Sequence, residues 1–517
     1  MTIALLHEIL DSTAERTPES PAVTVKGVTS SYRTLRTESL GMAQWLTCMG
    51  LRRGDRLVVA APTHQIHVPL IYGCSRIGVV YVILHDQVTS HGLLHVLRDT
   101  EPVLLITDDP GAERIAKDHG VLVASPAQAA HGMADTQQQL PPAPLTTAPL
   151  TVDPVCLIYT SGSTGMPNAV VSTHAQVVFA ADAIQSQLCY RPSDVVYSPL
   201  PLSFDYGMYQ LFVAALAGAH VHLADAADAG VLLLRRLRES GATVLPGVPS
   251  LAAILARLIE RHGGTIPLRL LTNTGADLSA RIVDQLRKQL PGLQVQLMFG
   301  LTECKRVSIM PPDHDRQRPG SCGKSLPGTE VVVVDDDGHP VPPRTVGEII
   351  VRGPHVMAGY WRRPELTAKR FRRVAGLFPQ LHTGDYGWLD EDGFLYFSGR
   401  RDDIYKSHGF RVSAIEVEAA AIRIPGVTAA AVLPPNAHRP EPVLFAVTDL
   451  TRTELHQLLV EQIEHYKVPR HCRVLDELPL NRNGKVDKAA LAELGWRSVG
   501  PEHPRELDVT VPKKLSA

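Results

Sequence analysis

Amphipathic helical periodicity alternates with short apolar, β-branched runs along most of the chain. A helical pattern from Tyr32 to Leu51 is followed by a turn at 53–55 and by an apolar segment at 56–61. The same order recurs at 71–84, 91–109 and 232–250. Repeated helix-then-strand units favour layered sheets covered by helices, so we expect an α/β fold with several subdomains.

The hydrophobic pattern changes at two places, which suggests domain boundaries. Residues 137–154 are rich in Pro, Thr and Gln, as is typical of an exposed connector, and they lead into an apolar strand at 155–160. After an apolar segment at 348–353, short strands and Gly/Asp turns run through 381–403. The helices and strands that follow from residue 413 predict a small α+β domain.

The composition excludes several classes of protein. The 51 Lys and Arg balance 53 Asp and Glu, so no excess of positive charge favours nucleic acid or an anionic membrane as a partner. Seven cysteines without a CxxC pair indicate neither a disulfide framework nor a zinc site. The N-terminus has no basic region of a secretory signal, and no apolar stretch is long enough to span a membrane. We therefore expect a soluble, cytoplasmic protein that acts on small molecules.

The loop after the strand at 155–160 is the most specific local signal. It consists of small hydroxyl residues and glycines, Thr160, Ser161, Gly162, Ser163, Thr164 and Gly165. Such a loop can direct backbone N–H groups and hydroxyls at phosphate oxygens, because glycine permits close approach. A flexible Ser/Gly turn is the alternative. The loop lacks the GxxxxGK[ST] pattern of the common NTPases.

Four further motifs follow in a fixed order: Phe299-GLTE, Thr383-Gly384-Asp385, Gly399-RRDDIYKSHGFRVS and Leu478-PLNRNGKVDK. With the Ser/Gly loop they resemble the adenylate-forming superfamily of acyl- and aryl-CoA synthetases, nonribosomal peptide synthetase adenylation domains and luciferase. The resemblance extends over nearly the whole chain. It implies that a carboxylic acid attacks the α-phosphorus of ATP, with Mg²⁺ and protein cations neutralising the developing charge.

The resemblance also implies roles for individual residues. Thr302 contacts the α-phosphate, Glu303 binds Mg²⁺ and Phe299 lies against adenine. Asp385 accepts the ribose hydroxyls, and Arg400 contacts ribose and phosphate. The loop that lines the adenine corresponds to Thr274, Gly275, Ala276 and Asp277.

Lys485 is the expected bridge between the substrate carboxylate and the α-phosphate, and it is carried by the small domain. The resemblance also implies two domains. Residues 1–399 would form an N-terminal body of layered αβ sheets with a small β-barrel-like subdomain. Residues 403–496 would form a mobile C-terminal α+β domain. Residues 400–402 form the hinge with Asp402, and 497–517 form a tail. Rotation about the hinge would bring the region of Gly409 to the site for attack by a thiol.

Asn168 departs from the family pattern. The Ser/Gly loop is usually followed by xPKG, whereas this chain has Met166-Pro167-Asn168-Ala169. The lysine commonly placed near the outer phosphates is therefore missing. We expect weaker or slower use of ATP without loss of activity, because Lys485 and Glu303 remain.

The acid-binding pocket of the family begins at Phe204-Asp205. Amino-acid activators commonly have this pair, in which the carboxylate binds the substrate ammonium, although Asp205 could instead cap the following helix. The remaining pocket positions correspond to Tyr206, Tyr209, Ser250, Thr272, Thr274, Met298, Arg306 and Val307. A buried Arg306 needs an anionic partner, which suggests a small polar acid with a second polar or anionic group. Pairing of Arg306 or Lys305 with a nearby acidic residue is the alternative.

The sequence thus predicts a two-step ligase that uses ATP and Mg²⁺. Only residues 489–517 follow Lys488, too few for a carrier domain, so the phosphopantetheine acceptor should be a separate acyl or peptidyl carrier protein. Coenzyme A is the alternative, because Lys406–Ser413 looks like acyl-CoA synthetases, and transfer to another nucleophile stays open. A non-enzymatic ATP-binding homologue is a further alternative, motivated by Asn168.

Overall fold

The chain folds as two compact units, Met1–Phe397 and Ser398–Ala517. A computed structural model describes residues 3–138, 148–160, 167–374, 376, 378–400, 403–407, 410–436, 439, 441–463, 465–481 and 486–497. The mixed α/β architecture predicted from the sequence is confirmed. The hinge role of 400–402 stays a prediction, and Asp402 lies outside the described residues.

The first sheet of the larger unit has seven strands. Their order is β18 (Gly359–Tyr360), β8 (Asn168–Thr173), β7 (Pro154–Thr160), β4 (Val80–Ile83), β3 (Arg56–Val59), β5 (Leu104–Ile106) and β6 (Leu122–Ala124). The strands from β7 to β6 pair in parallel, whereas β8 pairs antiparallel with both β7 and β18. The predicted strand at 155–160 is therefore confirmed as β7.

The second sheet combines a parallel and an antiparallel part. Its parallel strands are β1 (Pro21–Val25), β10 (His220–Leu223), β9 (Val195–Ser198), β11 (Val244–Gly247), β12 (Leu270–Asn273) and β13 (Gln294–Phe299), with β2 (Val28–Ser31) antiparallel at the edge. The antiparallel strands are β14 (Ser308–Ile309), β15 (Ser321–Ser325), β16 (Glu330–Val334), β17 (Gly347–Arg352), β19 (Phe371–Val374), β20 (Phe378–Leu389) and β21 (Leu395–Arg400). The short strands and turns predicted around 381–403 thus continue the large sheet.

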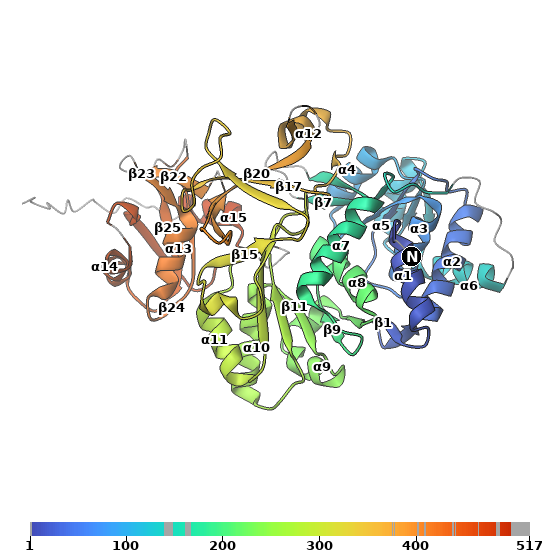
Figure 1. The fold of residues 1–517 in the computed structure, drawn as a ribbon, viewed down its shortest axis with the longest axis horizontal. Helices are drawn as coiled ribbons and strands as arrows, with labels where there is room; N and C mark the ends of the chain where they lie inside the picture. The colour runs from blue at the N-terminus through green and yellow to red at the C-terminus, as the bar shows by residue number, and fades with distance from the viewer. Residues whose placement is uncertain are drawn as a thin grey trace, which may run out of the picture. The chain divides into compact units, whose positions relative to one another are not determined.

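Helices cover both sheets in layers, because strand side chains alternate between two faces. Leu57 and Val59 face a core shared with α1 (Leu6–Arg16), α3 (His67–Ile77), α7 (His174–Leu188) and α8 (Asp205–Ala217), which lie between the sheets (Figure 1). Val58 faces the outer helices α4 (Ser90–Thr100) and α5 (Pro110–Asp118). The second sheet has its own outer layer of α9 (Leu233–Glu239), α10 (Pro249–His262) and α11 (Ala280–Gln289).

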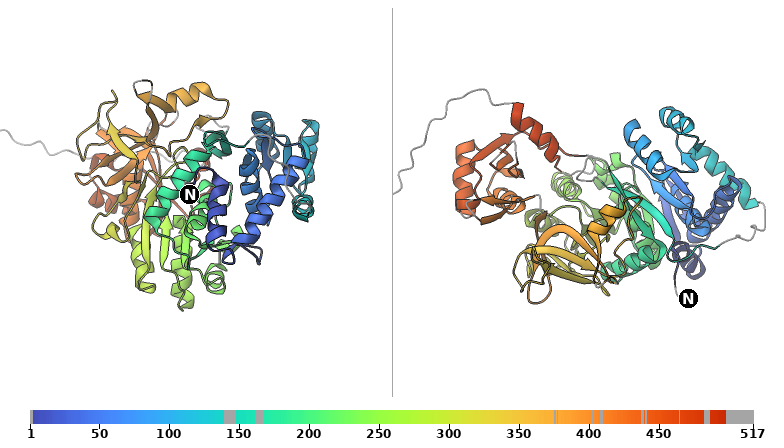
Figure 2. Two further views of the ribbon diagram at one scale, coloured as in Figure 1. Left: turned by 45° about the vertical axis from the view of Figure 1, so that its right-hand side comes forward. Right: turned by 90° about the horizontal axis from the view of Figure 1, so that it is seen from above.

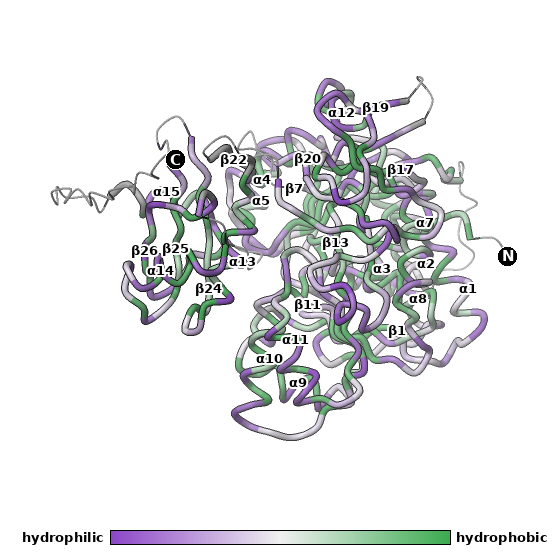
Figure 3. The backbone as a smooth tube through the Cα atoms, turned by 60° about the vertical axis from the view of Figure 1, so that its left-hand side comes forward, coloured by the Kyte–Doolittle hydropathy of each residue, from purple (hydrophilic) through white to green (hydrophobic). Residues whose placement is uncertain are grey.

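Three further helices complete the larger unit. The predicted helix at 32–51 is α2 (Tyr32–Cys48), capped by the Ser31 hydroxyl, which accepts a hydrogen bond from Thr34 N. It packs beside α6 (Pro126–Gln138), as Figure 2 shows. The short helix α12 (Pro364–Arg370) follows β18 and is hydrophilic over most of its length (Figure 3). Among the described residues, no helix is both long and apolar enough to cross a membrane.

The smaller unit has the α+β composition that the sequence predicts. It contains β22 (Ile404–Ser407), β23 (Phe410–Ser413), α13 (Ala414–Arg423), β24 (Val427–Leu433), β25 (Val443–Thr448), α14 (Arg452–Gln462), β26 (His471–Leu475) and α15 (Lys488–Arg497). Val432 and Leu444 face α13 and α14, while Leu433 and Phe445 face α15. The sequence pattern did not predict β26 or α15.

Candidate active site

The predicted pocket residues gather where four parallel strands end. Strands β9, β11, β12 and β13 are neighbours in one sheet, so their carboxyl ends lie at one edge. Such edges are where open α/β sheets bind ligands. Asp205 begins the helix after β9, Ser250 is the second residue of the helix after β11, Thr272 lies in β12 and Met298 lies in β13.

The loop 300–307 joins β13 to β14 and carries most of the candidate chemistry. Its ends are fixed by the antiparallel pairs Met298–Ile309 and Phe299–Ser308. A β-carbon on Gly300 would lie 2.2 Å from the carbonyl oxygen of Lys305, so only glycine permits this closure. Lys305 adopts a φ of 63°, an uncommon conformation for a residue with a side chain. Strain of this kind persists where the surrounding structure enforces it, as it often does at functional sites.

Arg306 and Asp205 form the charged centre of the pocket. Both side chains are buried, and Arg306 Nη1 lies 3.8 Å from Asp205 Oδ2. The guanidinium also stacks over the Tyr206 ring, 4.6 Å from its centroid, and donates to the carbonyl oxygen of Lys305 at 2.6 Å. Tyr206 in turn shares a hydrogen bond of 2.6 Å with the hydroxyl of Thr272. Burial raises the pKa of Tyr206 to about 12, so the phenol stays protonated.

Lys305 brings a second cation into the same buried region. Its side chain is 0% exposed, and its Nζ lies 5.7 Å from the centroid of the Tyr209 ring. Burial lowers the pKa of Lys305, while Asp205 opposes this shift. Lys305 Nζ, Arg306 Nε and Tyr209 Oη are all buried and have no hydrogen-bond partner within the described part of the chain.

The capping role considered for Asp205 is wrong. Phe204 is the N-cap residue of α8, no side chain caps this helix, and Asp205 is its first helical residue. The carboxylate, 3% exposed, lies close to Arg306, where the positive end of the helix also favours a negative charge. Pairing of Arg306 with a nearby acidic residue, considered as an alternative, is present in this form.

Glu303 lies on the same loop and is held by a residue that the sequence did not single out. The Tyr360 hydroxyl donates a 2.6 Å hydrogen bond to Glu303 Oε1, and the Met357 N–H donates to the Glu303 carbonyl oxygen at 2.9 Å. Carboxylate oxygen is a ligand that Mg²⁺ prefers, and Mg²⁺ commonly takes only one or two carboxylates beside phosphates and water. The single carboxylate of Glu303 therefore fits the predicted role.

The residues predicted to bind the nucleoside lie in the antiparallel part of the sheet and at the end of β12. Asp385 is buried in β20, where its N–H donates to the Thr383 hydroxyl at 3.0 Å. Phe299 is half-buried, and its ring centroid lies 5.0 Å from that of Phe397. Thr274 is buried just after β12, whereas Ala276 and Asp277 are exposed. Contact of these groups with adenine or ribose stays a prediction.

Several predicted residues cannot be placed. Ser161, Gly162, Ser163, Thr164, Gly165 and Lys485 lie outside the described residues. Thr160 is the last residue of β7, and its hydroxyl donates to the Asn168 carbonyl oxygen at 3.3 Å. Arg400 is an exposed residue at the end of β21. Val307 is buried at the end of the loop, and Thr302 is half-buried within it.

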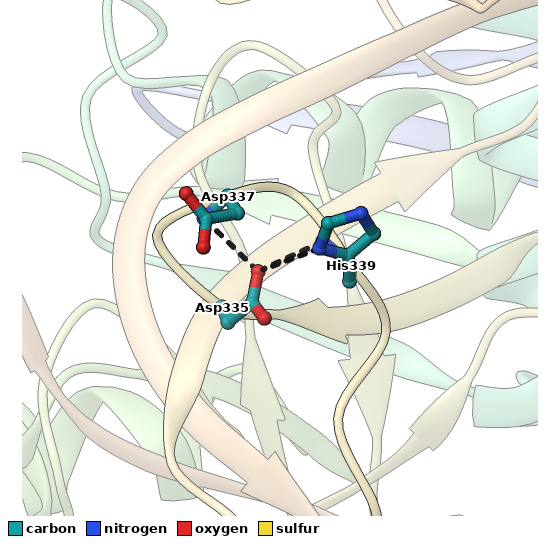
Figure 4. Close-up of side chains that lie close together, drawn as sticks. All are labelled: Asp335, Asp337 and His339. Atoms are coloured by element: carbon teal, nitrogen blue, oxygen red, sulfur yellow. Dashed lines mark hydrogen bonds and ion pairs between the residues drawn. The ribbon is translucent and has the colours of Figure 1, made fainter.

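An acidic cluster lies on the turn between β16 and β17. Asp335, Asp337 and His339 are exposed and bring their ligand atoms within 4.8 Å of one another (Figure 4). Asp335 Oδ1 already accepts hydrogen bonds from the backbone N–H groups of Asp337 and His339 at 3.0 and 2.8 Å. These bonds stabilise the turn, so we assign the cluster a structural role.

Comparison with known proteins gives two family matches. The AMP-binding enzyme model matches residues 10–361, and the model of the AMP-binding enzyme C-terminal domain matches residues 416–485. A feruloyl-CoA synthase of Amycolatopsis sp is 32% identical over 92% of this chain and 96% of its own length. An L-proline–[L-prolyl-carrier protein] ligase of Streptomyces coelicolor is 31% identical over 92% of this chain and 94% of its own.

Solved structures of related enzymes also match most of the chain. The structure of VinN in complex with L-aspartate has 41% sequence identity to this chain and a TM-score of 0.71. The match covers 76% of this chain and 98% of the VinN chain. The o-succinylbenzoate coenzyme A synthetase of Bacillus subtilis, in complex with ATP and a magnesium ion, is 26% identical. It covers 92% of this chain and 98% of its own, with a TM-score of 0.79.

Proposed function

Because the chain belongs to the AMP-binding enzyme family and is an AMP-forming ligase, we propose that its acid substrate is a small amino acid with a second carboxylate. The single observation that carries this proposal is the pair of buried cations, Lys305 and Arg306, beside one buried carboxylate, Asp205. The complex of the related VinN with L-aspartate supports it.

Charge balance gives the physical reason. A buried charge is costly unless it is paired. Lys305 and Arg306 lie near Asp205, and the other buried carboxylate acting on Lys305 is Glu303, which is expected to hold Mg²⁺. With Glu303 assigned to the metal, two cations beside one anion leave the acid pocket with one positive charge in excess. The substrate ammonium would pair with Asp205, and its second carboxylate would pair with Lys305 and Arg306. The carboxylate that reacts brings the remaining negative charge. An aromatic acid without an ammonium or a second carboxylate would offer no charged partner to Asp205 or to the second cation.

The reaction follows from the family. The acid carboxylate attacks the α-phosphorus of ATP, which gives acyl-AMP and pyrophosphate. Thr302 would donate a hydrogen bond to the α-phosphate, and Lys485 would neutralise the charge shared by carboxylate and phosphate. Mg²⁺ bound at Glu303 would supply further neutralisation of the phosphates, and Tyr360 would keep that carboxylate oriented.

Substrate-dependent exchange of labelled pyrophosphate into ATP tests the proposed acid. We expect exchange with L-aspartate to exceed exchange with succinate, which lacks the ammonium, and with L-asparagine and β-alanine, which each lack one carboxylate. Removing one charged partner from a buried pair costs about 3–5 kcal/mol, so the differences should be at least about a hundredfold. Equal exchange with ferulate or another neutral aromatic acid would contradict the proposal.

We further propose that the acyl group passes to the phosphopantetheine thiol of a separate carrier protein. The carrier-protein ligase among the relatives and the Phe204-Asp205 pair support this acceptor. Coenzyme A is the second candidate, supported by the feruloyl-CoA synthase and by Lys406–Ser413. Incubation of the preformed acyl-adenylate with a phosphopantetheinylated carrier or with coenzyme A, followed by mass spectrometry, distinguishes them. Faster thioester formation with coenzyme A would reject the carrier.

The missing lysine at position 168 gives a smaller prediction. Asn168 is half-buried at the start of β8, and Asn168→Lys would add a cation near the outer phosphates. We expect the KM for ATP to fall by about two- to tenfold, the effect of one added hydrogen bond. Asn168→Gln is the matched control, because it lengthens the side chain without charge. An unchanged KM and adenylation rate in the lysine variant would show that the position does not limit ATP use.

A further inference from the structure

Arg370 is a cation in the candidate nucleotide site that the sequence motifs do not include. It is the last residue of α12 and is half-buried, whereas its neighbours Lys369 and Arg372 are exposed. Its Nη1 lies so close to Gly384 that a β-carbon there would be 2.5 Å from it. The guanidinium thus lies against strand β20 at Gly384, the residue before Asp385.

The same guanidinium also lies near a residue that contacts the predicted metal ligand. It lies close enough to the Tyr360 hydroxyl to interact with it, and that hydroxyl donates a hydrogen bond to Glu303 Oε1 at 2.6 Å. The charges of the Glu303 and Asp385 carboxylates act on Arg370 and favour its positive charge. A positive charge therefore lies near both the residue expected to hold Mg²⁺ and the residue expected to hold ribose. In a bound nucleotide the phosphates connect these two positions.

Strand pairing relates Arg370 to Asn168. Val170 of β8 pairs with Tyr360 of β18, and the two side chains share a buried cluster with Met357. Asn168 is two residues before Val170 in a regular strand, so its side chain points to the same face. Arg370 lies near the hydroxyl of Tyr360, which packs on this face. The cation of Arg370 and the side chain of Asn168 are thus presented on one side of β8.

We propose that Arg370 supplies the positive charge at the ATP phosphates that the family motif would place on a lysine at position 168. The guanidinium can donate two parallel hydrogen bonds to a phosphate, which makes it an effective replacement for an ammonium. In the free protein the negative charges of Glu303 and Asp385 favour its protonated form. The inference requires that the protein binds ATP, and it is independent of which acid the pocket accepts.

Calorimetric titration with MgATP and with adenosine tests the proposal without any acid substrate. We expect Arg370→Ala to weaken MgATP binding by about ten- to a hundredfold, because a hydrogen-bonded charge is lost. Adenosine, which has no phosphate, should bind with an unchanged dissociation constant. Arg370→Lys should restore part of the MgATP affinity. Lys369→Ala, an exposed cation one residue earlier, is the matched control and should leave both ligands unaffected.

A second arm tests the relation to Asn168. Adding Asn168→Lys to Arg370→Ala should restore MgATP affinity by a larger factor than Asn168→Lys achieves alone. If the alanine variant does not fold, Arg370→Gln keeps a hydrogen-bond donor for Tyr360 without the charge. Equal weakening of MgATP and adenosine would show that Arg370 only positions Glu303 and Asp385. Such equal weakening would overturn the proposal. Unchanged MgATP binding by Arg370→Ala, or no restoration of affinity by Asn168→Lys, would overturn it as well.

Discussion

Replacing Lys305 with methionine is expected to lower kcat/KM for an amino acid with a second carboxylate by roughly two to four orders of magnitude. Breaking one buried ion pair costs about 3–5 kcal/mol, and the substrate carboxylate would lose one of its two cations. The measurement is steady-state pyrophosphate release with L-aspartate and, for comparison, with β-alanine. The loss should be confined to the substrate that carries the second carboxylate.

The same variant is expected to unfold at higher denaturant concentration than the parent. Lys305 is fully buried, Asp205 keeps Arg306 as a partner, and methionine has a similar length without a charge. Replacing a buried ion by an apolar residue is often stabilising by about 1–4 kcal/mol. Lys288→Met, on the exposed face of α11, is the control and should change neither property. A variant with intact activity or clearly reduced stability would contradict the assigned role.

Replacing Asp205 with asparagine is expected to reduce both activity and stability. The substrate ammonium would lose its carboxylate, which lowers kcat/KM by roughly two to four orders of magnitude. In the free protein, Arg306 would lose its buried ion-pair partner and Lys305 one of the carboxylates near it, so the free energy of unfolding should fall by about 3–5 kcal/mol. Chemical denaturation and pyrophosphate release measure the two effects.

Two controls separate these effects. Asp182→Asn removes an exposed carboxylate from α7 and should leave activity and stability unchanged. Combining Asp205→Asn with Lys305→Met should recover stability, because one of the two unpaired cations is removed. The Asp205 variant should also prefer succinate over L-aspartate more than the parent does. If the preference between these two acids does not move, the carboxylate does not bind the ammonium.

Local signals made much of the fold predictable from the sequence. The helix at Tyr32, the strand at Pro154 and the small α+β domain each follow from periodicity and capping within one segment. Helix α15 and strand β26 have weak local patterns, and their identity as elements depends on packing in the smaller unit. The continuation of the parallel sheet into antiparallel strands also depends on long-range pairing, which periodicity does not encode.

In the candidate site too, residues marked by local sequence could be predicted, whereas residues placed by long-range contacts could not. The ordered motifs predicted Glu303 and Asp385 as site residues, and the Phe204-Asp205 pair predicted Asp205, because their neighbours in the sequence are distinctive. Tyr360 and Arg370 were missed because the hydrogen bond of Tyr360 to Glu303 and the position of Arg370 beside Gly384 join distant segments. Lys305 was considered only as a partner for an acidic residue. Its burial depends on the fold of the loop 300–307, and the residue types of that loop do not reveal it.

In the hairpin between β13 and β14, the backbone contacts that hold the sheet together are separate from the side chains proposed to bind the acid. Backbone pairing at Met298–Ile309 and Phe299–Ser308, together with the closure at Gly300, sets its shape without using the charge of Lys305 or Arg306. Those two positions can therefore diverge between homologues while the scaffold is kept. If these two positions select the acid as proposed, a change of acid preference during evolution would need few mutations and would leave the residues proposed to bind the nucleotide unchanged.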